Sequence, residues 1–454
     1  MEKKLYLNDF ASELPILDII SIFIILLISI FDINSMVPPF VLGIILIISG
    51  VLFFFSYEKY YSTLITIKSI FTLMWFLSAG LSLLRLHPLQ KQWSSDTWIV
   101  VCLTYIGFMT GTFLQTIFSK NKLNESKLIQ DSESSVDVIF LLGLIIIGAF
   151  VCDCLYSKEI PILSSEMASY QEFGFPIIHY FTVFGCLYPG IAYGAIKQCK
   201  NRQLYSIKKR ISLIKIEATI IALFPILAVS RMQLLIELFV LLFFWYMYGW
   251  KEQKVRKFYL LLIIVLAIVI WIVLSSFRNQ DYLYISTVFK LNLKSNIESA
   301  LWQIYLYIGF GFDNLNYLIN HFVNFSNGQL VFRGLLSIIG LDNYLDPMAG
   351  NTDNYRILLT FNTYTMAKDP FMDFGIAGVF PYMLFIGFFS SYIERKSRFR
   401  KSYIWMSAYA LVVYGLIVCF FNNIFAAKMI VADLLIILLI NSLTKHRYER
   451  NNVG

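Results

Sequence analysis

The chain has 454 residues, of which 58% are hydrophobic and only 15% are charged, and its formal net charge is +8. Soluble globular proteins are about half apolar and about one quarter charged, so this composition excludes a single soluble domain. Its six cysteines lie in or beside apolar runs, and this placement indicates small buried residues instead of a secreted disulfide framework. No small-residue cleavage site follows the first apolar run, so we expect a retained first helix.

A transmembrane helix needs about twenty consecutive apolar residues, and this criterion predicts about twelve spans. Only Ser230 and Arg231 separate the seventh span from the eighth, so a continuous helix there would reduce the count to eleven. We expect an all-α polytopic membrane protein whose residues 1–454 form one transmembrane domain. In chain order the expected spans are 15–32, 36–55, 64–84, 98–118, 136–156, 174–196, 211–230, 232–249, 258–276, 374–392, 402–421 and 424–442.

The distribution of lysine and arginine predicts the orientation, because cytoplasmic loops carry the basic excess. Alternate loops of the twelve-span topology are basic, whereas the short loops 33–36 and 422–423 contain no lysine or arginine. This pattern predicts a multi-pass protein of the cytoplasmic (inner) cell membrane with both termini in the cytoplasm. The positive charge then faces anionic lipid headgroups of the bilayer, so we expect no nucleic-acid partner.

One loop is much longer than the others. Residues 277–373 form a predicted external segment of about one hundred residues, with room for short helices of its own. Within it, 297–312 is aromatic and apolar but too short to span, which indicates an interfacial or re-entrant helix. Function in membrane proteins concentrates where irregular backbone lines a cavity, so the candidate residues are sought here.

Four arginines lie on the predicted external side: Arg231 and Arg278 at helix ends, and Arg333 and Arg356 in the long loop. The guanidinium group binds phosphate through a planar fork and stays charged at any relevant pH. A simpler alternative is that these side chains extend to lipid headgroups or pair with a nearby aspartate.

The second candidate region lies where the long loop returns to the membrane. Asn362 offers hydrogen-bonding groups to sugar hydroxyls, Tyr364 offers a flat apolar face, and Asp373 could orient or deprotonate a hydroxyl. Gly375 and Gly378 permit close helix approach. The simpler alternative is a turn followed by a helix with an acidic residue at its N-terminus.

Other chemistry is disfavoured by the motifs that the sequence lacks. The four histidines show no metal-ligand spacing, and His179 is expected to be structural. There is no Walker loop, no GxGxxG and no GxSxG. We therefore expect neither a metal site nor a cofactor.

The sequence resembles the bacterial O-antigen and capsule repeat-unit polymerases of the Wzy type. The likeness lies in one large external loop before the last three spans, in "SRMQLLIELFVLLFF" from Ser230, and in "NTYTMAKDPFMDFGIAGV" at 362–379. The resemblance implies a membrane glycosyltransferase with a GT-C-like fold. Such an enzyme uses undecaprenyl-diphosphate-linked oligosaccharide as its substrate, and a flippase and a chain-length regulator of the same pathway are expected partners.

By the same resemblance, Arg231 and Arg278 would hold the diphosphate, and Asn362, Tyr364 and Asp373 would line the sugar site. The growing glycan would pass to the non-reducing end of a new lipid-linked unit on the outer face of the membrane. The alternatives are a lipid-linked oligosaccharide flippase or other transporter, and an O-antigen ligase. Related ligases place a histidine where the loop returns, and this chain has Asn362 there, which leaves the general base unidentified.

Overall fold

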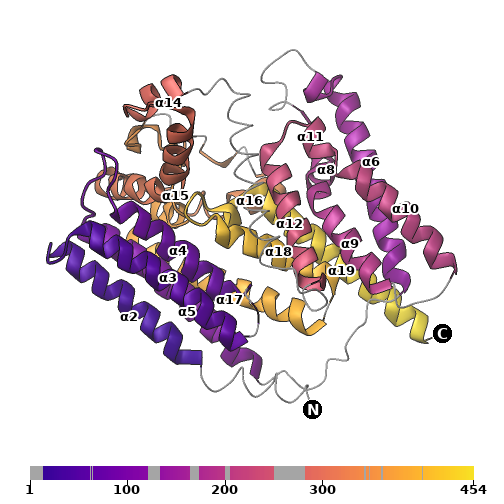
Figure 1. Cartoon of the computed structure of the whole chain (residues 1–454). Coiled ribbons are helices and arrows are strands. Elements are labelled where there is room, and N and C mark those ends of the chain that lie inside the picture. The colour runs from indigo at the N-terminus through magenta and orange to yellow at the C-terminus, as the bar shows by residue number, and fades with distance from the viewer. Residues whose placement is uncertain are drawn as a thin grey trace.

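The structure is a computed structural model that describes residues 14–61, 63, 65–120, 133–163, 173–199, 205–249, 282–341, 344–346, 348–358, 361–400 and 402–453. Throughout these ranges the regular elements are helices, and none is a strand (Figure 1). The α-helices are α2 (Leu14–Ile33), α3 (Pro39–Tyr61), α4 (Ile67–Leu83), α5 (Ser95–Lys120), α6 (Glu133–Ser157), α8 (His179–Phe184), α9 (Tyr188–Cys199), α10 (Tyr205–Ile221), α11 (Phe224–Leu227), α12 (Arg231–Gly249), α14 (Tyr282–Phe289), α15 (Asn296–His321), α16 (Arg333–Ile338), α17 (Lys368–Arg400), α18 (Tyr403–Ile417) and α19 (Lys428–Val453). Short 3-10 turns are η1 (Pro161–Leu163), η2 (Gly185–Leu187), η4 (Asp353–Tyr355) and η5 (Ile424–Ala426).

Five of these helices are long and apolar enough to cross a membrane, by length and composition. Their outward side chains are also apolar: Ile19 is 61% exposed, Leu52 61% and Leu155 74%. Large exposed apolar surfaces of this kind are typical of contact with lipid. The chain is therefore an all-helical membrane protein. The five candidate spans are Ile16–Ile33, Pro39–Tyr61, Ser95–Ser119, Val136–Ser157 and Lys368–Arg398.

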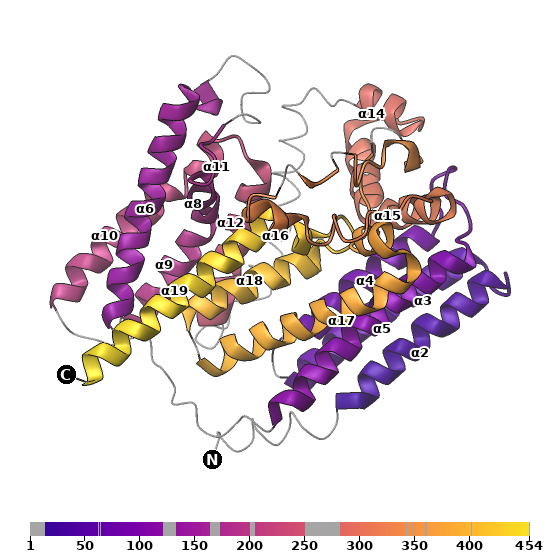
Figure 2. The same cartoon turned by 180° about the vertical axis from the view of Figure 1, so that it is seen from behind.

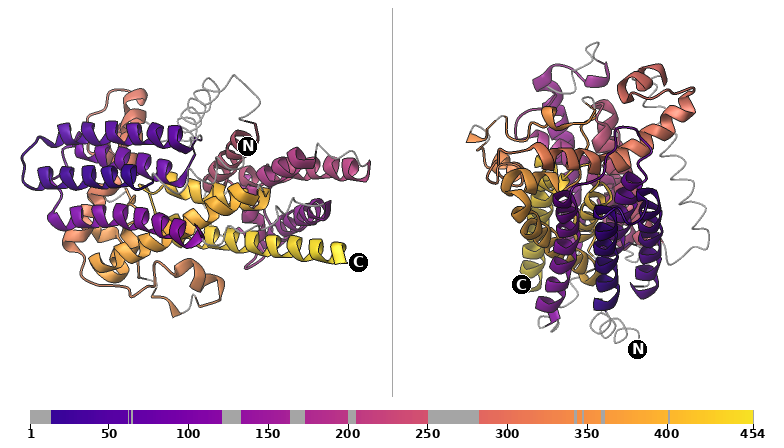
Figure 3. Two further views of the ribbon diagram at one scale, coloured as in Figure 1. Left: turned by 90° about the horizontal axis from the view of Figure 1, so that it is seen from below. Right: turned by 90° about the vertical axis from the view of Figure 1, so that its left-hand side faces the viewer.

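The helices form two groups that are joined by the C-terminal helices. Helices α2 to α5 lie side by side, and α6 and α8 to α12 form the second group (Figure 1). Helix α18 packs against α4 of the first group and α12 of the second. The elements α14 and α15 lie at one end of the molecule, and the end of α19 lies at the other (Figures 2 and 3).

Each remaining predicted span that falls within the described residues coincides with one or more helices, although some helix boundaries differ from the predicted ones. The predicted span 258–276 lies outside the described residues. The expected span 174–196 is interrupted, since η2 separates α8 from α9. Pro189 lacks an N–H, so it cannot continue the α-helical ladder, and the preceding turn tightens to a 3-10 form.

The seventh and eighth expected spans are separate helices. Helix α10 ends at Ile221, nine residues earlier than expected, and α12 begins at Arg231. Pro225 interrupts the ladder between them, and Val229 adopts a left-handed backbone with φ of 53°. The chain therefore breaks over residues 222–230 instead of turning only at Ser230 and Arg231.

Helices α5 and α17 are in close backbone contact. A Cβ atom on Gly111 would stand 2.1 Å from the carbonyl oxygen of Leu384, and one on Gly387 would stand 2.1 Å from that of Phe108. Glycine at both positions lets the two backbones touch, as is common between membrane helices. This contact fixes α17, the helix that follows the long loop.

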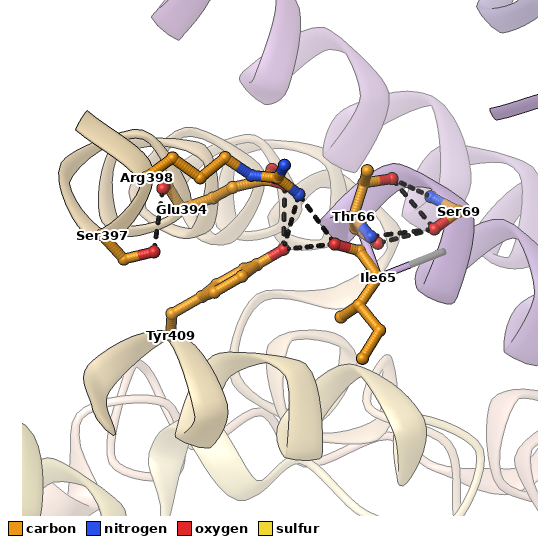
Figure 4. Close-up of polar contacts among 7 residues, drawn as sticks. All are labelled: Ile65, Thr66, Ser69, Glu394, Ser397, Arg398 and Tyr409. Atoms are coloured by element: carbon orange, nitrogen blue, oxygen red, sulfur yellow. Dashed lines mark hydrogen bonds and ion pairs between the residues drawn. The ribbon is translucent and has the colours of Figure 1, made fainter. Parts of the chain in front are cut away.

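A polar cluster ties the far end of α17 to the other helices (Figure 4). Arg398 donates to the carbonyl oxygen of Ile65 at 2.7 Å and forms an ion pair with Glu394 at 2.8 Å. The Tyr409 hydroxyl on α18 lies 2.9 Å from both the Ile65 carbonyl oxygen and Glu394. These partly buried charged groups are stable because each one has a partner.

Candidate functional site

Helix α15 is longer than the expected segment 297–312, and its added residues attach it to α4 and the turn that follows α4. It continues to His321 because its polar residues find partners elsewhere in the chain. Asp313 is 1% exposed and accepts hydrogen bonds from Ser82 at 2.8 Å and from Gln90 at 2.7 Å. Burial raises the pKa of Asp313 to about 7, although these donors oppose the shift.

Asn314 on the same helix holds the end of the long loop. Its Nδ2 donates to the carbonyl oxygens of Thr363 at 2.9 Å and Phe361 at 3.2 Å, and its Oδ1 accepts from the Ile357 N–H at 3.1 Å. Asn314 is fully buried, so these bonds satisfy a side chain that water does not reach. The loop end is thus built on α15 as a fixed platform.

The segment 361–366 is extended and pairs with the turn between α18 and α19. The N–H of Tyr364 donates to the carbonyl oxygen of Phe421 at 3.1 Å, and that of Met366 donates to Cys419 at 2.7 Å. Tyr364 is 2% exposed, and its hydroxyl donates to the Tyr355 carbonyl oxygen at 2.9 Å. Its ring is therefore part of the loop packing, whereas Asn362 is exposed.

Asp373 is completely buried and holds a neighbouring turn of the loop. Its carboxylate accepts the N–H of Leu330 at 3.1 Å and the N–H of Val331 at 2.8 Å. Its own carbonyl oxygen accepts the N–H of Asn327 at 3.1 Å. This geometry favours a role in positioning residues 326–331, and a role of Asp373 as a base stays a prediction.

Gly375 breaks α17 directly after this anchor. It has φ of 66° and ψ of −159°, a conformation that glycine adopts without a steric penalty, and the helix axis kinks there. The kink separates residues 368–374 from the long apolar part of the helix. Gly378 follows in the first turn of that part, where a Cβ would stand 2.9 Å from the Pro370 carbonyl oxygen.

Two cations begin the helices that meet at the contact between α16 and the start of α19. A Cβ on Gly334 would stand 2.7 Å from the Ala426 carbonyl oxygen, so α16 packs directly on this turn. Arg333 precedes Gly334 and is exposed, and Lys428 follows Ala427. No acidic side chain pairs with Arg333 among the residues that the structure describes.

Two other cations lie at the loop end. Arg356 forms an ion pair with Asp353 at 2.8 Å, and Lys368 forms one with Asp369 at 3.1 Å. The Lys368 ammonium lies 5.7 Å from the centre of the Tyr364 ring, within the range of a cation–π contact. The expected aspartate partner of Arg356 is therefore present, which was the simpler alternative for this arginine.

Of the two arginines predicted at helix ends, Arg231 and Arg278, the structure describes only the backbone of Arg231. Arg231 begins α12, and the next residue, Met232, has its sulfur 3.9 Å from the Tyr414 hydroxyl near the end of α18. The start of α12 therefore lies level with the turn that pairs with residues 364–366. The position of the Arg231 side chain and the whole of Arg278 lie outside the described residues.

A histidine–aspartate pair joins α6 to the start of α8 and was not expected from the sequence. His179 Nδ1 is 2.8 Å from Asp153 Oδ2, and Asp153 Oδ1 accepts the N–H of Phe175 at 2.7 Å. The adjacent residue Tyr180 has its ring 5.3 Å from the Lys428 ammonium. Sequence spacing could not indicate this pair, because 26 residues and a chain reversal separate its members.

The arrangement combines exposed and partly paired cations with polar loop segments at one end of the molecule. Such a surface can bind an anionic group and stabilise negative charge that develops on a leaving group. Within the described residues, no group of three or more histidine, cysteine or acidic side chains could hold a metal ion. Comparison with family models, curated proteins and solved structures gives no match, so the assignment of function depends on these residues.

Proposed function

We propose that the chain is a membrane glycosyltransferase that polymerises undecaprenyl-diphosphate-linked oligosaccharide repeat units into O-antigen or capsular polysaccharide. The growing glycan leaves its lipid diphosphate and joins the non-reducing end of a new lipid-linked unit. The proposal includes about twelve spans in a GT-C-like arrangement, both termini in the cytoplasm, and a reaction on the outer face of the cytoplasmic membrane.

The observation that carries the proposal is the gathering of cations from separate parts of the chain at one end. Arg333 and Lys428 flank the contact between α16 and α19, and Arg356 and Lys368 lie at the loop end. Helix α12 begins with Arg231 at the same level. A lipid diphosphate is an anion held at the membrane surface, and these positions suit its capture.

The anchoring contacts support a preorganised site. Asp373 fixes the turn that leads into α16, and Asn314 fixes the segment that contains Asn362 and Tyr364. Charge on a departing diphosphate is stabilised most by donors that already stand in place. In the proposed reaction, Arg231, Arg278 and Arg333 bind the diphosphate, and exposed Asn362 contacts sugar hydroxyls.

The decisive test uses the purified protein in liposomes with lipid-linked repeat units extracted from the parent strain. We expect long glycan chains from the wild type without any ion gradient across the vesicle. The variants Arg231→Ala and Arg278→Ala should leave single repeat units on lipid. The control variant Lys294→Ala, which removes an exposed charge from the long loop, should polymerise the units normally.

The outcomes separate the alternatives. Normal chain-length ladders from both arginine variants would refute the role of these residues in diphosphate binding. Movement of labelled lipid across the bilayer without polymer would identify a transporter instead. Transfer of glycan to a lipid A acceptor but not to a second repeat unit would identify a ligase.

A further inference from the structure

We propose that His179, held by Asp153, is the general base that deprotonates the acceptor sugar hydroxyl. This inference rests on the proposed glycosyl transfer, and it supplies the acid–base group that the loop return at 362–378 does not offer. It assigns a catalytic function to the start of α8, far in sequence from the long loop.

The imidazole is fixed in one orientation. The Asp153 side chain is fully buried and can only accept hydrogen bonds when ionised, so Nδ1 of His179 carries the proton at this 2.8 Å contact. Nε2 then keeps a free lone pair, and it makes no hydrogen bond within the part of the chain that the structure describes. The His179 side chain is 31% exposed, whereas that of Asp153 is fully buried.

The backbone around the imidazole is shaped to support it. Gly174 adopts φ of 127°, and a Cβ there would stand 2.4 Å from His179 Nδ1. Phe175, the next residue, donates its N–H to the second oxygen of Asp153. Both carboxylate oxygens are thus engaged, one by the ring and one by the backbone. A base held by a third group in this way is the arrangement that general-base catalysis uses.

Helix α19 connects the His179–Asp153 pair to the elements that carry the cations of the proposed diphosphate site. Lys428 stacks over Tyr180, which follows His179, and α16 with Arg333 packs against the turn before Lys428. Helix α19 contacts both α8 and α16, and these helices lie together in Figure 1. The charged groups on these packed elements include Asp153 on α6, Arg333 on α16, and Lys428 and the fully buried Asp433 on α19.

The proposed step balances as follows. The acceptor hydroxyl gives its proton to His179 Nε2 while its oxygen forms a bond to the anomeric carbon of the donor. The bond between that carbon and the diphosphate oxygen breaks, and its electron pair leaves on the diphosphate. The imidazolium remains paired with Asp153, and the new negative charge on the diphosphate is stabilised by the cations beside it.

The other acids of the loop return are already engaged. Asp373 is completely buried and accepts the N–H groups of Leu330 and Val331. Asp369 is 7% exposed and paired with Lys368. Both oxygens of Asp373 are therefore occupied by backbone donors, and one oxygen of Asp369 is held by the Lys368 ammonium.

The test measures polymerisation by the purified full-length protein in liposomes, with lipid-linked repeat units from the parent strain. We expect His179→Gly to lower kcat by about 100-fold with little change in KM. Added imidazole should restore part of the rate, which a merely structural role would not explain. Asp153→Asn should lower kcat by about 10-fold or more, because the tautomer is no longer fixed. His321→Gln, an exposed histidine on the same end of the molecule, should match the wild type.

The results distinguish the two proposals. If the wild type polymerises and His179→Gln keeps a rate within about twofold of it, the general-base role is wrong. Loss of rate in His179→Gly with no response to imidazole, in a protein whose melting temperature is unchanged, would also overturn it. If the wild type makes no polymer from these units, the proposed function itself fails.

Discussion

The Asp373 carboxylate accepts the backbone N–H of Val331 at 2.8 Å, although 42 residues separate the two in the chain. This bond joins the start of α17 to the turn that leads into α16. A second bond to the Leu330 N–H strengthens it. The cationic end of the long loop is therefore positioned by an acid at the kink of a candidate membrane helix.

We expect Asp373→Ala to destabilise the protein, because it leaves two N–H groups of a buried turn without an acceptor. Each buried unpaired donor costs about 1–3 kcal/mol, so the loss for two donors is on the order of 2–6 kcal/mol. Denaturant unfolding in detergent measures it. Asp373→Asn, which keeps one acceptor oxygen, should lose less, and Asp346→Asn on the exposed loop should stay within about 0.5 kcal/mol. Equal stability of the Ala variant and the wild type would refute the anchoring role.

The second prediction concerns Arg333, which is exposed at the start of α16. Removing a charged donor that contacts the diphosphate should raise KM for the lipid-linked unit by about 10-fold. Arg333→Lys keeps the charge but loses the planar fork, so it should recover only part of the affinity. Steady-state kinetics in liposomes measure this effect, with Lys294→Ala as the charge-matched control. An unchanged KM in Arg333→Ala would remove this residue from the site.

Much of the helical layout could be predicted because it depends on local composition. Apolar runs of membrane length locate α2, α3, α5 and α6 within a few residues, and the return of the loop at 362–378 coincides with the kinked start of α17. The extended length of α15 could not be predicted in the same way. Its Asp313 and Asn314 look unfavourable in isolation, and they are stable only because Gln90 and Thr363 are their partners.

The candidate site could also be predicted only in part, because the pairing of its side chains depends on tertiary contacts. The sequence indicates which residue types bind phosphate or sugar, but it does not show which of them already have partners. Arg356 pairs with Asp353, and Tyr364 packs inside the loop, whereas Arg333 and Asn362 remain exposed. The pairing of His179 with Asp153 depends on the tertiary contact between α6 and α8.

The orientation of the chain is testable by cysteine labelling. Asn324 is exposed beside the turn that Asp373 holds, and Lys59 is exposed near the end of α3 at the opposite end of the molecule. We expect a membrane-impermeant maleimide to label Asn324→Cys in intact cells and Lys59→Cys only after permeabilisation. The native cysteines must be replaced first, because Cys152 is exposed. The reverse labelling pattern would invert the topology.

The last prediction concerns the pH dependence that Asp313 gives to stability. Its pKa is about 7 in the folded chain and about 3.9 in an unfolded one. Between these values the folded state holds a proton that the unfolded state has released, so stability falls as the pH rises from about 4 to about 7. The slope from one such group is at most about 1.4 kcal/mol per pH unit, and above pH 7 it vanishes.

His87 gives the free energy of unfolding a pH dependence of the opposite sign. Burial lowers the pKa of its imidazole, so the stability from this group rises with pH as the imidazole becomes neutral. The two effects overlap in the wild type, so the comparison with Asp313→Asn is the informative one. We expect the difference in unfolding free energy between the two proteins to change between pH 4.5 and 7 and to be constant above pH 7.5. Denaturant titrations of both in the same detergent measure it. A difference that is constant over the whole range would show that Asp313 titrates normally and that α15 is held to α4 without any linkage to protons.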